Sequence, residues 1–230
     1  IVSAIQNTVA ITDTAFMGRV GEVEQAAIGL ISIYYLILFM IGFSYTKGTQ
    51  ILIARRNGEG RERAVGRIFD QSAILVLGFA GLMLLLLQLF GDESVALVVS
   101  DKAVAAQAAD YLRVRSYGLI FGFIGVVFLA FYMGIGRTLI IFYSIVCLTI
   151  VNVILNYVLI FGKWGFPEMG IEGAALASNI AEVVSVVVFA IFAVVLKYYR
   201  RYRLFRTLKL NLKLARSITA IGLPIVLQSV

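Results

Sequence analysis

Residues 139–161 read LIIFYSIVCLTIVNVILNYVLIF, a run without a charged side chain. A helix needs roughly 20 consecutive apolar residues to cross the hydrocarbon core of a bilayer, and this run is long enough. Backbone groups in lipid must be hydrogen-bonded within their own segment, so a helix is favoured over a strand. The run therefore predicts a transmembrane helix.

Runs of the same kind recur along the whole chain, which is 61% hydrophobic and only 14% charged. Such a chain has too little polar surface to cover a water-soluble globule. The predicted fold class is an all-α integral membrane protein with a six-helix transmembrane bundle and a truncated seventh helix. We expect the other helices over residues 1–17 (incomplete), 26–54, 68–90, 111–136 and 174–196, with the seventh beginning near Ile218.

These helices divide the chain into three parts. Residues 1–196 are expected to form the six-helix bundle, in which the first helix is truncated. Residues 197–217 are basic and are expected to form a cytoplasmic linker, and residues 218–230 begin the seventh helix. We interpret the chain as an internal piece of a longer protein, because both of its ends lie within apolar runs.

The basic residues predict the orientation of the bundle, because Lys and Arg are retained in cytoplasmic loops. The net charge of +7 thus reflects topology in a plasma or inner membrane, and the opposite loops are mostly acidic. The Tyr- and Arg-rich segment 197–203 indicates a juxtamembrane anchor rather than a nucleic-acid site. The residues expected in the cytoplasm are Arg55, Arg56, Arg61, Arg63, Arg67, Arg137, Lys197, Arg200, Arg201, Arg203, Arg206, Lys209, Lys213 and Arg216.

Polar side chains at membrane depth are the candidates for function, because they are costly there and usually face the interior of the bundle. Asp13 lies near the outer end of the first predicted helix. A desolvated carboxylate can exchange a proton for a cation, so Asp13 is a candidate cation or proton site. The alternative is an acid at a helix end that is solvated among the lipid headgroups.

Two further sets of polar residues lie in the fifth and sixth predicted helices. Asn152 and Asn156 are four residues apart, so both amides lie on one helix face, where they can coordinate Na⁺ or bind a neighbouring helix. Ser178 and Glu182 also share a face, while Asn179 points about 100° away. Glu182 is either a second embedded, titrating acid or the partner of a residue on another helix.

Other polar groups carry weaker signals. We expect the long side chains of Arg113, Arg115 and Lys47 to reach a membrane interface, and Asp70 to pair with Arg67. Histidine is absent and Cys147 is the only cysteine, so an enzyme would have only carboxylates and hydroxyls to work with. The chain is therefore predicted not to be an enzyme, and a cysteine-rich metal site is excluded.

Several segments resemble the multidrug and toxic compound extrusion (MATE) transporters. TDTAFMGRVG at 12–21 and AAIGL at 26–30 resemble the end of the family's first helix and the start of its second. GTQ at 48–50 and ARRNGEG at 54–60 resemble the inner end of the second helix. The most specific match is NVILNY at 152–157, continuing through FGKWGFPEMG at 161–170 to IEGAALAS at 171–178. The matches follow the family's order along nearly the whole chain.

The resemblance implies twelve helices in two six-helix lobes, of which this chain supplies the amino-terminal lobe and the start of the second. Asp13 matches the acid that the family uses for cation coupling, and Asn152 and Asn156 match positions that contribute to the same site. Some members carry an aspartate where this chain has Asn156, so a strongly acidic, proton-only site is not expected. Ser178 stands where relatives often have threonine, and its hydroxyl can join the cluster. Glu182 has no assigned role in the family.

The resemblance further implies a cation-coupled antiporter that exports organic, often cationic, drugs or toxic metabolites. The coupling ion is Na⁺ or H⁺, and Na⁺ would be held by Asp13, Asn152 and Asn156. No other cofactor is expected, and the partners are the lipid bilayer, a small organic substrate and the ion, with a monomer at full length. The alternatives are a lipid-linked saccharide flippase of the same superfamily, a membrane-embedded enzyme and a purely structural membrane scaffold.

Overall fold

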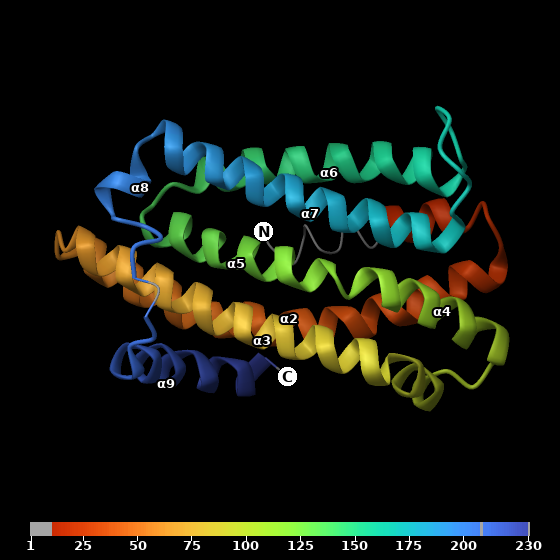
Figure 1. Cartoon of the computed structure of the whole chain (residues 1–230), viewed down its shortest axis with the longest axis horizontal. Coiled ribbons are helices and arrows are strands. Elements are labelled where there is room, and N and C mark those ends of the chain that lie inside the picture. Colours follow the sequence, from red (N-terminus) through yellow and green to blue (C-terminus); the bar gives the residue numbers. More distant parts are fainter. Residues whose placement is uncertain (1–10, 208, 230) are drawn as a thin grey trace. The chain divides into compact units, whose positions relative to one another are not determined.

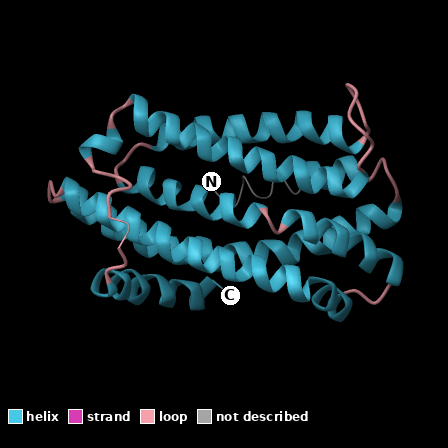
Figure 2. Ribbon diagram, in the orientation of Figure 1, coloured by secondary structure: helices cyan, strands magenta, loops and turns pink. Residues whose placement is uncertain are grey.

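The computed structural model describes residues 11–207 and 209–229, and its regular structure in these ranges is entirely helical (Figures 1 and 2). Residues 11–17 are helical, which is the described part of the predicted first helix; residues 1–10 of that prediction lie outside the described residues. The labelled helices are α2 (Glu22–Gly58), α3 (Glu62–Val98), α4 (Lys102–Arg115), α5 (Gly118–Gly134), α6 (Thr138–Ile160), α7 (Gly170–Val195), α8 (Tyr198–Arg201) and α9 (Leu212–Ser229).

Four of the described helices are long and apolar enough to cross a membrane: α2, α3, α6 and α7. Helices α4 and α5 pass the same test only as a pair, bent by 55° at a short break. The prediction of one helix over 111–136 is therefore wrong, since α4 ends at Arg115 and α5 begins at Gly118. The break follows Arg115. There the Ser116 hydroxyl donates to the carbonyl of Arg113 at 2.9 Å, so a side chain provides a hydrogen bond to the backbone at the end of α4.

Helix α9 begins at Leu212, ahead of the start near Ile218 that the apolar run suggests. Asn211 explains the earlier start, because its side-chain oxygen accepts a hydrogen bond from the backbone N–H of Leu214 at 3.2 Å. Its carbonyl also accepts from the N–H of Ala215. Asn211 is thus an N-cap, which satisfies donors that a helix start leaves open.

The described residues form two compact units. The first contains the described residues up to Leu36 together with Leu82–Phe121 and Ile145–Val184. In its core, Val158 and Leu159 of α6 pack with Ala177 of α7. A Cβ on Gly173 would lie 2.9 Å from the carbonyl oxygen of Leu159, so only glycine lets α7 approach the α6 backbone this closely. This close approach places the polar faces of α6 and α7 against each other.

The second unit contains Ile37–Gly81, Gly122–Ser144 and the described residues from Ser185 onward. Its core is aromatic: Phe69 lies 5.2 Å from Phe128 and 5.4 Å from Phe131 between ring centroids. Such tilted and edge-on contacts are favourable beyond the area that they bury. Tyr132, fully buried beside these rings, donates its hydroxyl to the carbonyl of Phe189 at 2.7 Å.

Asp70 of α3 has a different partner from the predicted Arg67. Its carboxylate accepts hydrogen bonds from three consecutive backbone N–H groups, those of Phe205, Arg206 and Thr207, at 2.7, 3.0 and 2.8 Å. The next residue, Gln71, donates to the carbonyl of Lys209 and accepts from the N–H of Asn211. The segment between α8 and α9 is therefore fastened to α3 by these two side chains.

Candidate functional site

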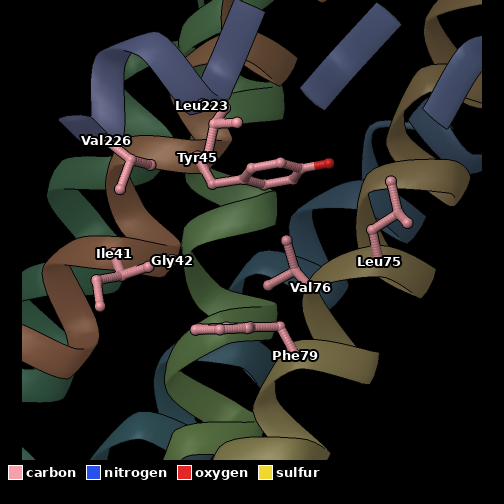
Figure 3. Close-up of a pocket in the computed structure, with 8 residues that line it drawn as sticks. All are labelled: Ile41, Gly42, Tyr45, Leu75, Val76, Phe79, Leu223 and Val226. Atoms are coloured by element: carbon pink, nitrogen blue, oxygen red, sulfur yellow. The ribbon is translucent and has the colours of Figure 1, made fainter. Parts of the chain in front are cut away.

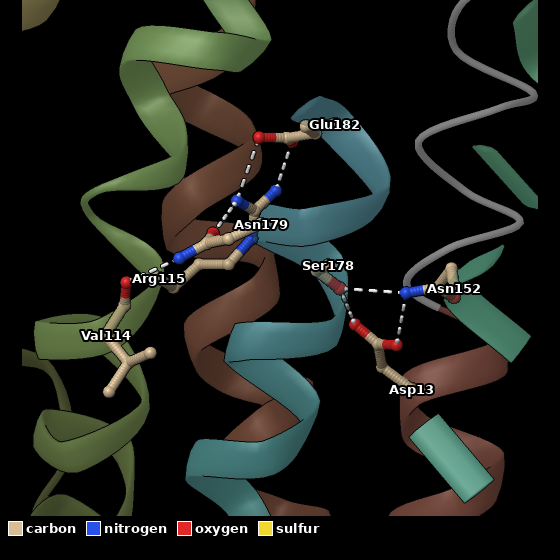
Figure 4. Close-up of polar contacts among 7 residues, drawn as sticks. All are labelled: Asp13, Val114, Arg115, Asn152, Ser178, Asn179 and Glu182. Atoms are coloured by element: carbon tan, nitrogen blue, oxygen red, sulfur yellow. Dashed lines mark hydrogen bonds and ion pairs between the residues drawn. The ribbon is translucent and has the colours of Figure 1, made fainter. Parts of the chain in front are cut away.

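The first helix, α6 and α7 bring four of the predicted site residues together around one buried carboxylate. Asn156 Nδ2 donates to Asp13 Oδ1 at 2.6 Å, and Asn152 Nδ2 donates to the same oxygen at 3.4 Å. Ser178 Oγ donates to Asp13 Oδ2 at 2.8 Å (Figure 4). Asp13 is 1% exposed, so an acid solvated among lipid headgroups does not describe it.

The three neighbours of Asp13 are also hydrogen-bonded to one another. Asn152 Nδ2 lies 3.1 Å from Ser178 Oγ, and Asn156 Nδ2 lies 3.3 Å from Asn152 Oδ1. One buried acceptor is left over, because Asn156 Oδ1 has no hydrogen-bond partner among the described residues. Leaving such a group unpaired is costly, so its presence is the kind of feature that a ligand accounts for.

The chemistry of this cluster favours a small hard cation or a proton. The carboxylate of Asp13, the amide oxygens of Asn152 and Asn156, and the Ser178 hydroxyl are all oxygen donors, which hard cations prefer. A transition metal fits poorly, because no three His, Cys, Asp or Glu side chains come together in the described part of the chain. The same hydrogen bonds also join three helices, so the interpretation of the two asparagines as contacts between helices fits as well.

Glu182 lies in a separate cluster, paired with Arg115 at the end of α4. Both Nη atoms of Arg115 donate to the carboxylate, Nη1 to Oε2 at 3.2 Å and Nη2 to Oε1. Arg115 Nη1 also donates to Asn179 Oδ1 at 2.7 Å, and its guanidinium lies 4.1 Å from the Tyr35 ring centroid. Of the two interpretations of Glu182, pairing with another helix is the one that the structure shows.

The expectation that Arg115 reaches a membrane interface is wrong, because its side chain is only 4% exposed. The break after Arg115 ends α4, and Glu182 supplies the countercharge that a buried guanidinium requires. Arg113, by contrast, is largely exposed and lies 3.2 Å from Asp92. The sequence did contain a signal for the Arg115–Glu182 pair, because each residue lies within an apolar segment and embedded charges usually pair.

A cavity of about 300 Å³ lies in the second unit, between α2, α3 and α9 (Figure 3). Its described lining is apolar apart from Tyr45, whose hydroxyl lies 2.9 Å from Thr219 Oγ1. Phe79, Leu223 and Val226 are among the side chains that point into it (Figure 3). Such a cavity can hold a hydrophobic group but offers no charge for recognition.

With this geometry established, the family can be determined. A family model described as MatE matches residues 1–158, which is more than half of the chain. The chain belongs to the MatE family. The MatE match includes Asp13, Asn152 and Asn156, and the family membership that the sequence motifs predicted is confirmed.

A MatE relative from Rhizobium meliloti (strain 1021), named "Probable multidrug resistance protein NorM", is 32% identical over 168 residues. The similarity covers 73% of this chain and 36% of the relative. A second, named likewise, from Synechocystis sp. (strain ATCC 27184 / PCC 6803 / Kazusa), is 28% identical over 173 residues, covering 72% of this chain and 36% of that protein. The chain therefore spans about a third of the length of these curated MatE relatives.

A solved MatE structure shares this fold. The crystal structure of MATE in the bent conformation has a TM-score of 0.87 and 21% identity, and the match covers 98% of this chain and 49% of that chain. The predicted fold class, an all-α membrane protein that corresponds to one lobe of a MATE transporter, is confirmed. The chain is a multi-pass membrane protein.

Proposed function

We propose that the full-length protein is a cation-coupled antiporter that exports organic compounds, and that this chain carries its coupling site. The observation that carries the proposal is the Asp13 cluster. Its buried carboxylate is held by Asn152, Asn156 and Ser178, and beside it lies a buried amide oxygen that has no hydrogen-bond partner among the described residues. The cluster joins residues from three helices, so a change at the carboxylate acts on all three.

The coupling ion acts by changing these hydrogen bonds. Without the ion, Asp13 accepts from Asn156, Asn152 and Ser178. A proton on either carboxylate oxygen gives that oxygen an O–H donor and weakens it as an acceptor. Asn156 Oδ1, which has no hydrogen-bond partner among the described residues, is then a suitable acceptor for the new O–H. Na⁺ would instead draw on the oxygens of Asp13, Asn152 and Asn156.

Such a change drives transport only if the ion binds two conformations of the protein with different affinities. In our proposal, the ion-bound cluster favours the conformation with low affinity for the exported compound. Parallel lobes that rock about a central site are a common arrangement in secondary transporters. The protein then alternates between loading the compound from the cytoplasm and releasing it in exchange for the ion.

We extend the proposal to the substrate, the partners and the placement of the protein in the membrane. Relatives named as multidrug resistance proteins support export of organic, often cationic, compounds, and the apolar cavity beside Phe79 offers room for a hydrophobic group. We also propose that the basic loops lie in the cytoplasm and that the protein lies in the plasma or inner membrane. At full length it is proposed to be a monomer. A lipid-linked saccharide flippase is the second candidate, but it would call for a large charged cavity, whereas the described lining of this one is apolar.

The test is efflux by the full-length protein in proteoliposomes, with ethidium as the organic cation and Na⁺ and pH gradients applied separately. We expect Asp13→Asn to lower gradient-driven efflux at least tenfold, because the amide cannot exchange its charge with a cation. Glu93→Gln, which removes an exposed acid from α3, serves as the matched control and should leave efflux unchanged. Undiminished efflux in Asp13→Asn would overturn the proposal, and transport of a lipid-linked saccharide instead of ethidium would favour the flippase.

A further inference from the structure

The first unit holds a second buried polar cluster, formed by Arg115, Glu182, Asn179 and Tyr35, and Figure 4 draws the first three of these residues. The Arg115 and Glu182 side chains are 4% and 7% exposed, so each charge lacks water and depends on the other. An ion pair buried this deeply is not explained by stability alone, because apolar side chains of similar volume are often as stable or more so. A role for the charges themselves therefore has to be considered.

The break between α4 and α5 is built around Arg115. Asn179 Nδ2 donates to the carbonyl of Val114 at 2.7 Å, which satisfies an acceptor that the end of α4 leaves open. A Cβ on Gly118 would overlap both Arg115 Nη1 and Asn179 Oδ1, so glycine at this position leaves the room that the guanidinium occupies. The position of the Arg115 charge is thus defined by backbone and side chains together.

This cluster is connected to the Asp13 site in two ways. Ser178, which donates to Asp13, and Asn179, which holds Arg115, are consecutive residues of α7. Figure 4 also shows the two clusters next to each other along α7, with Ser178 and Asn179 between Asp13 and Arg115. The groups that face these charges are Tyr35 from α2, Tyr111 from α4, Asn152 and Asn156 from α6, and Ser178 from α7.

We propose that the Arg115–Glu182 pair sets the cation affinity of the Asp13 site. Glu182 neutralises Arg115, so the guanidinium neither repels an incoming cation nor replaces it as the countercharge of Asp13. Both are positioning residues that act through Asp13 and touch neither the ion nor the exported compound. The inference rests on the proposed coupling role of Asp13.

The proposal predicts shifts of opposite sign when either charge is removed. Glu182→Gln leaves the Arg115 charge uncompensated beside Asp13, which disfavours a bound cation. Arg115→Gln leaves the Glu182 charge uncompensated, which favours one. Unpaired neighbouring charges shift the occupancy of an ionisable site by about tenfold or more. A variant that merely loosens the fold would have no reason to move the two affinities in opposite directions.

The experiment measures ethidium efflux by the full-length protein in proteoliposomes and reports the half-saturating concentration of Na⁺ and of H⁺ separately from the maximal rate. For the driving ion, we expect Glu182→Gln to raise the half-saturating concentration about tenfold and Arg115→Gln to lower it. The double variant Arg115→Gln with Glu182→Gln should have a half-saturating concentration within about twofold of that of the original protein. The same is expected of Arg115→Lys, which keeps the charge.

The outcomes separate this inference from the proposed function. Suppose that Asp13→Asn abolishes coupling, but that Glu182→Gln and Arg115→Gln leave the half-saturating ion concentration unchanged or shift it in the same direction. This result would overturn the role of the pair and leave the role of Asp13 in coupling intact. Efflux that is unchanged in Asp13→Asn would remove both. Where a single variant does not fold, the neutral double variant and Arg115→Lys decide, because a tenfold shift in either one contradicts charge balance.

Discussion

Ser178 is the residue at which a small change in side chain best separates hydrogen bonding from packing. Its hydroxyl donates to Asp13 Oδ2, and hydrogen bonds to charged groups are worth about 1.5–3 kcal/mol. We expect Ser178→Ala to reduce cation-driven efflux at least fivefold, because one carboxylate oxygen loses its donor. Ser178→Thr keeps the hydroxyl and should stay within threefold; equal losses in both variants would count against the hydrogen bond.

Gly118 is the residue whose lack of a side chain the Arg115 cluster requires. A methyl group in Gly118→Ala would overlap Arg115 Nη1 and Asn179 Oδ1, and such overpacking costs about 1–3 kcal/mol. We therefore expect a lower unfolding temperature for the purified full-length variant. Gly29→Ala is the matched control in the same unit, since a Cβ there meets nothing within 4 Å. A stability of Gly118→Ala equal to that of the control would contradict the contact.

At the scale of helices, the segment between α8 and α9 depends on α3. Asp70 binds three backbone N–H groups of residues 205–207 and is 4% exposed, whereas the Glu62–Arg201 ion pair nearby in sequence is partly exposed. We expect Asp70→Ala to speed tryptic cleavage after Arg203 and Arg206 several-fold, because the segment loses its fastening. Glu62→Gln should change the cleavage rate little, since exposed ion pairs contribute about 0–1 kcal/mol.

The contact between α6 and α7 and the bend between α4 and α5 depend both on local composition and on packing. Gly173 of α7 lies against the backbone of Leu159, which brings α7 close to α6 and places Ser178 beside Asn152. The bend between α4 and α5 depends on Asn179 of α7, which satisfies the carbonyl of Val114. The helix that carries Ser178 is therefore also the helix that supports the broken one.

At the scale of the whole molecule, the charge pattern predicts which loops face the cytoplasm. Cys147 is the only cysteine of this chain, so its replacement, together with that of any cysteine elsewhere in the full-length protein, leaves a background for single new thiols. In this cysteine-free full-length background, we expect Trp164→Cys, at a position 77% exposed, to react with a membrane-impermeant maleimide added outside intact cells. Arg61→Cys should react only after the membrane is opened. The reverse labelling pattern would invert the proposed orientation.

The sequence by itself determined the fold class and the family, and it selected Asp13, Asn152, Asn156 and Ser178 as one set. Hydropathy acts over a single helix, so the apolar runs locate α2, α3, α6 and α7 without knowledge of their neighbours. Motif order along the chain then indicated the MatE family. The role of the four residues in coupling stays a prediction, although the structure brings their side chains into contact.

Only the tertiary structure decided the partners of the remaining charges. Arg115 pairs with Glu182 instead of reaching an interface, and Asp70 binds backbone N–H groups instead of Arg67. These partners lie 67 and about 135 positions away, so no local pattern specifies them. Leaving a buried charge without a countercharge or hydrogen-bond donor is costly, so the charge pairs with the group that lies beside it in the packed helices. Helix packing therefore determines the partner.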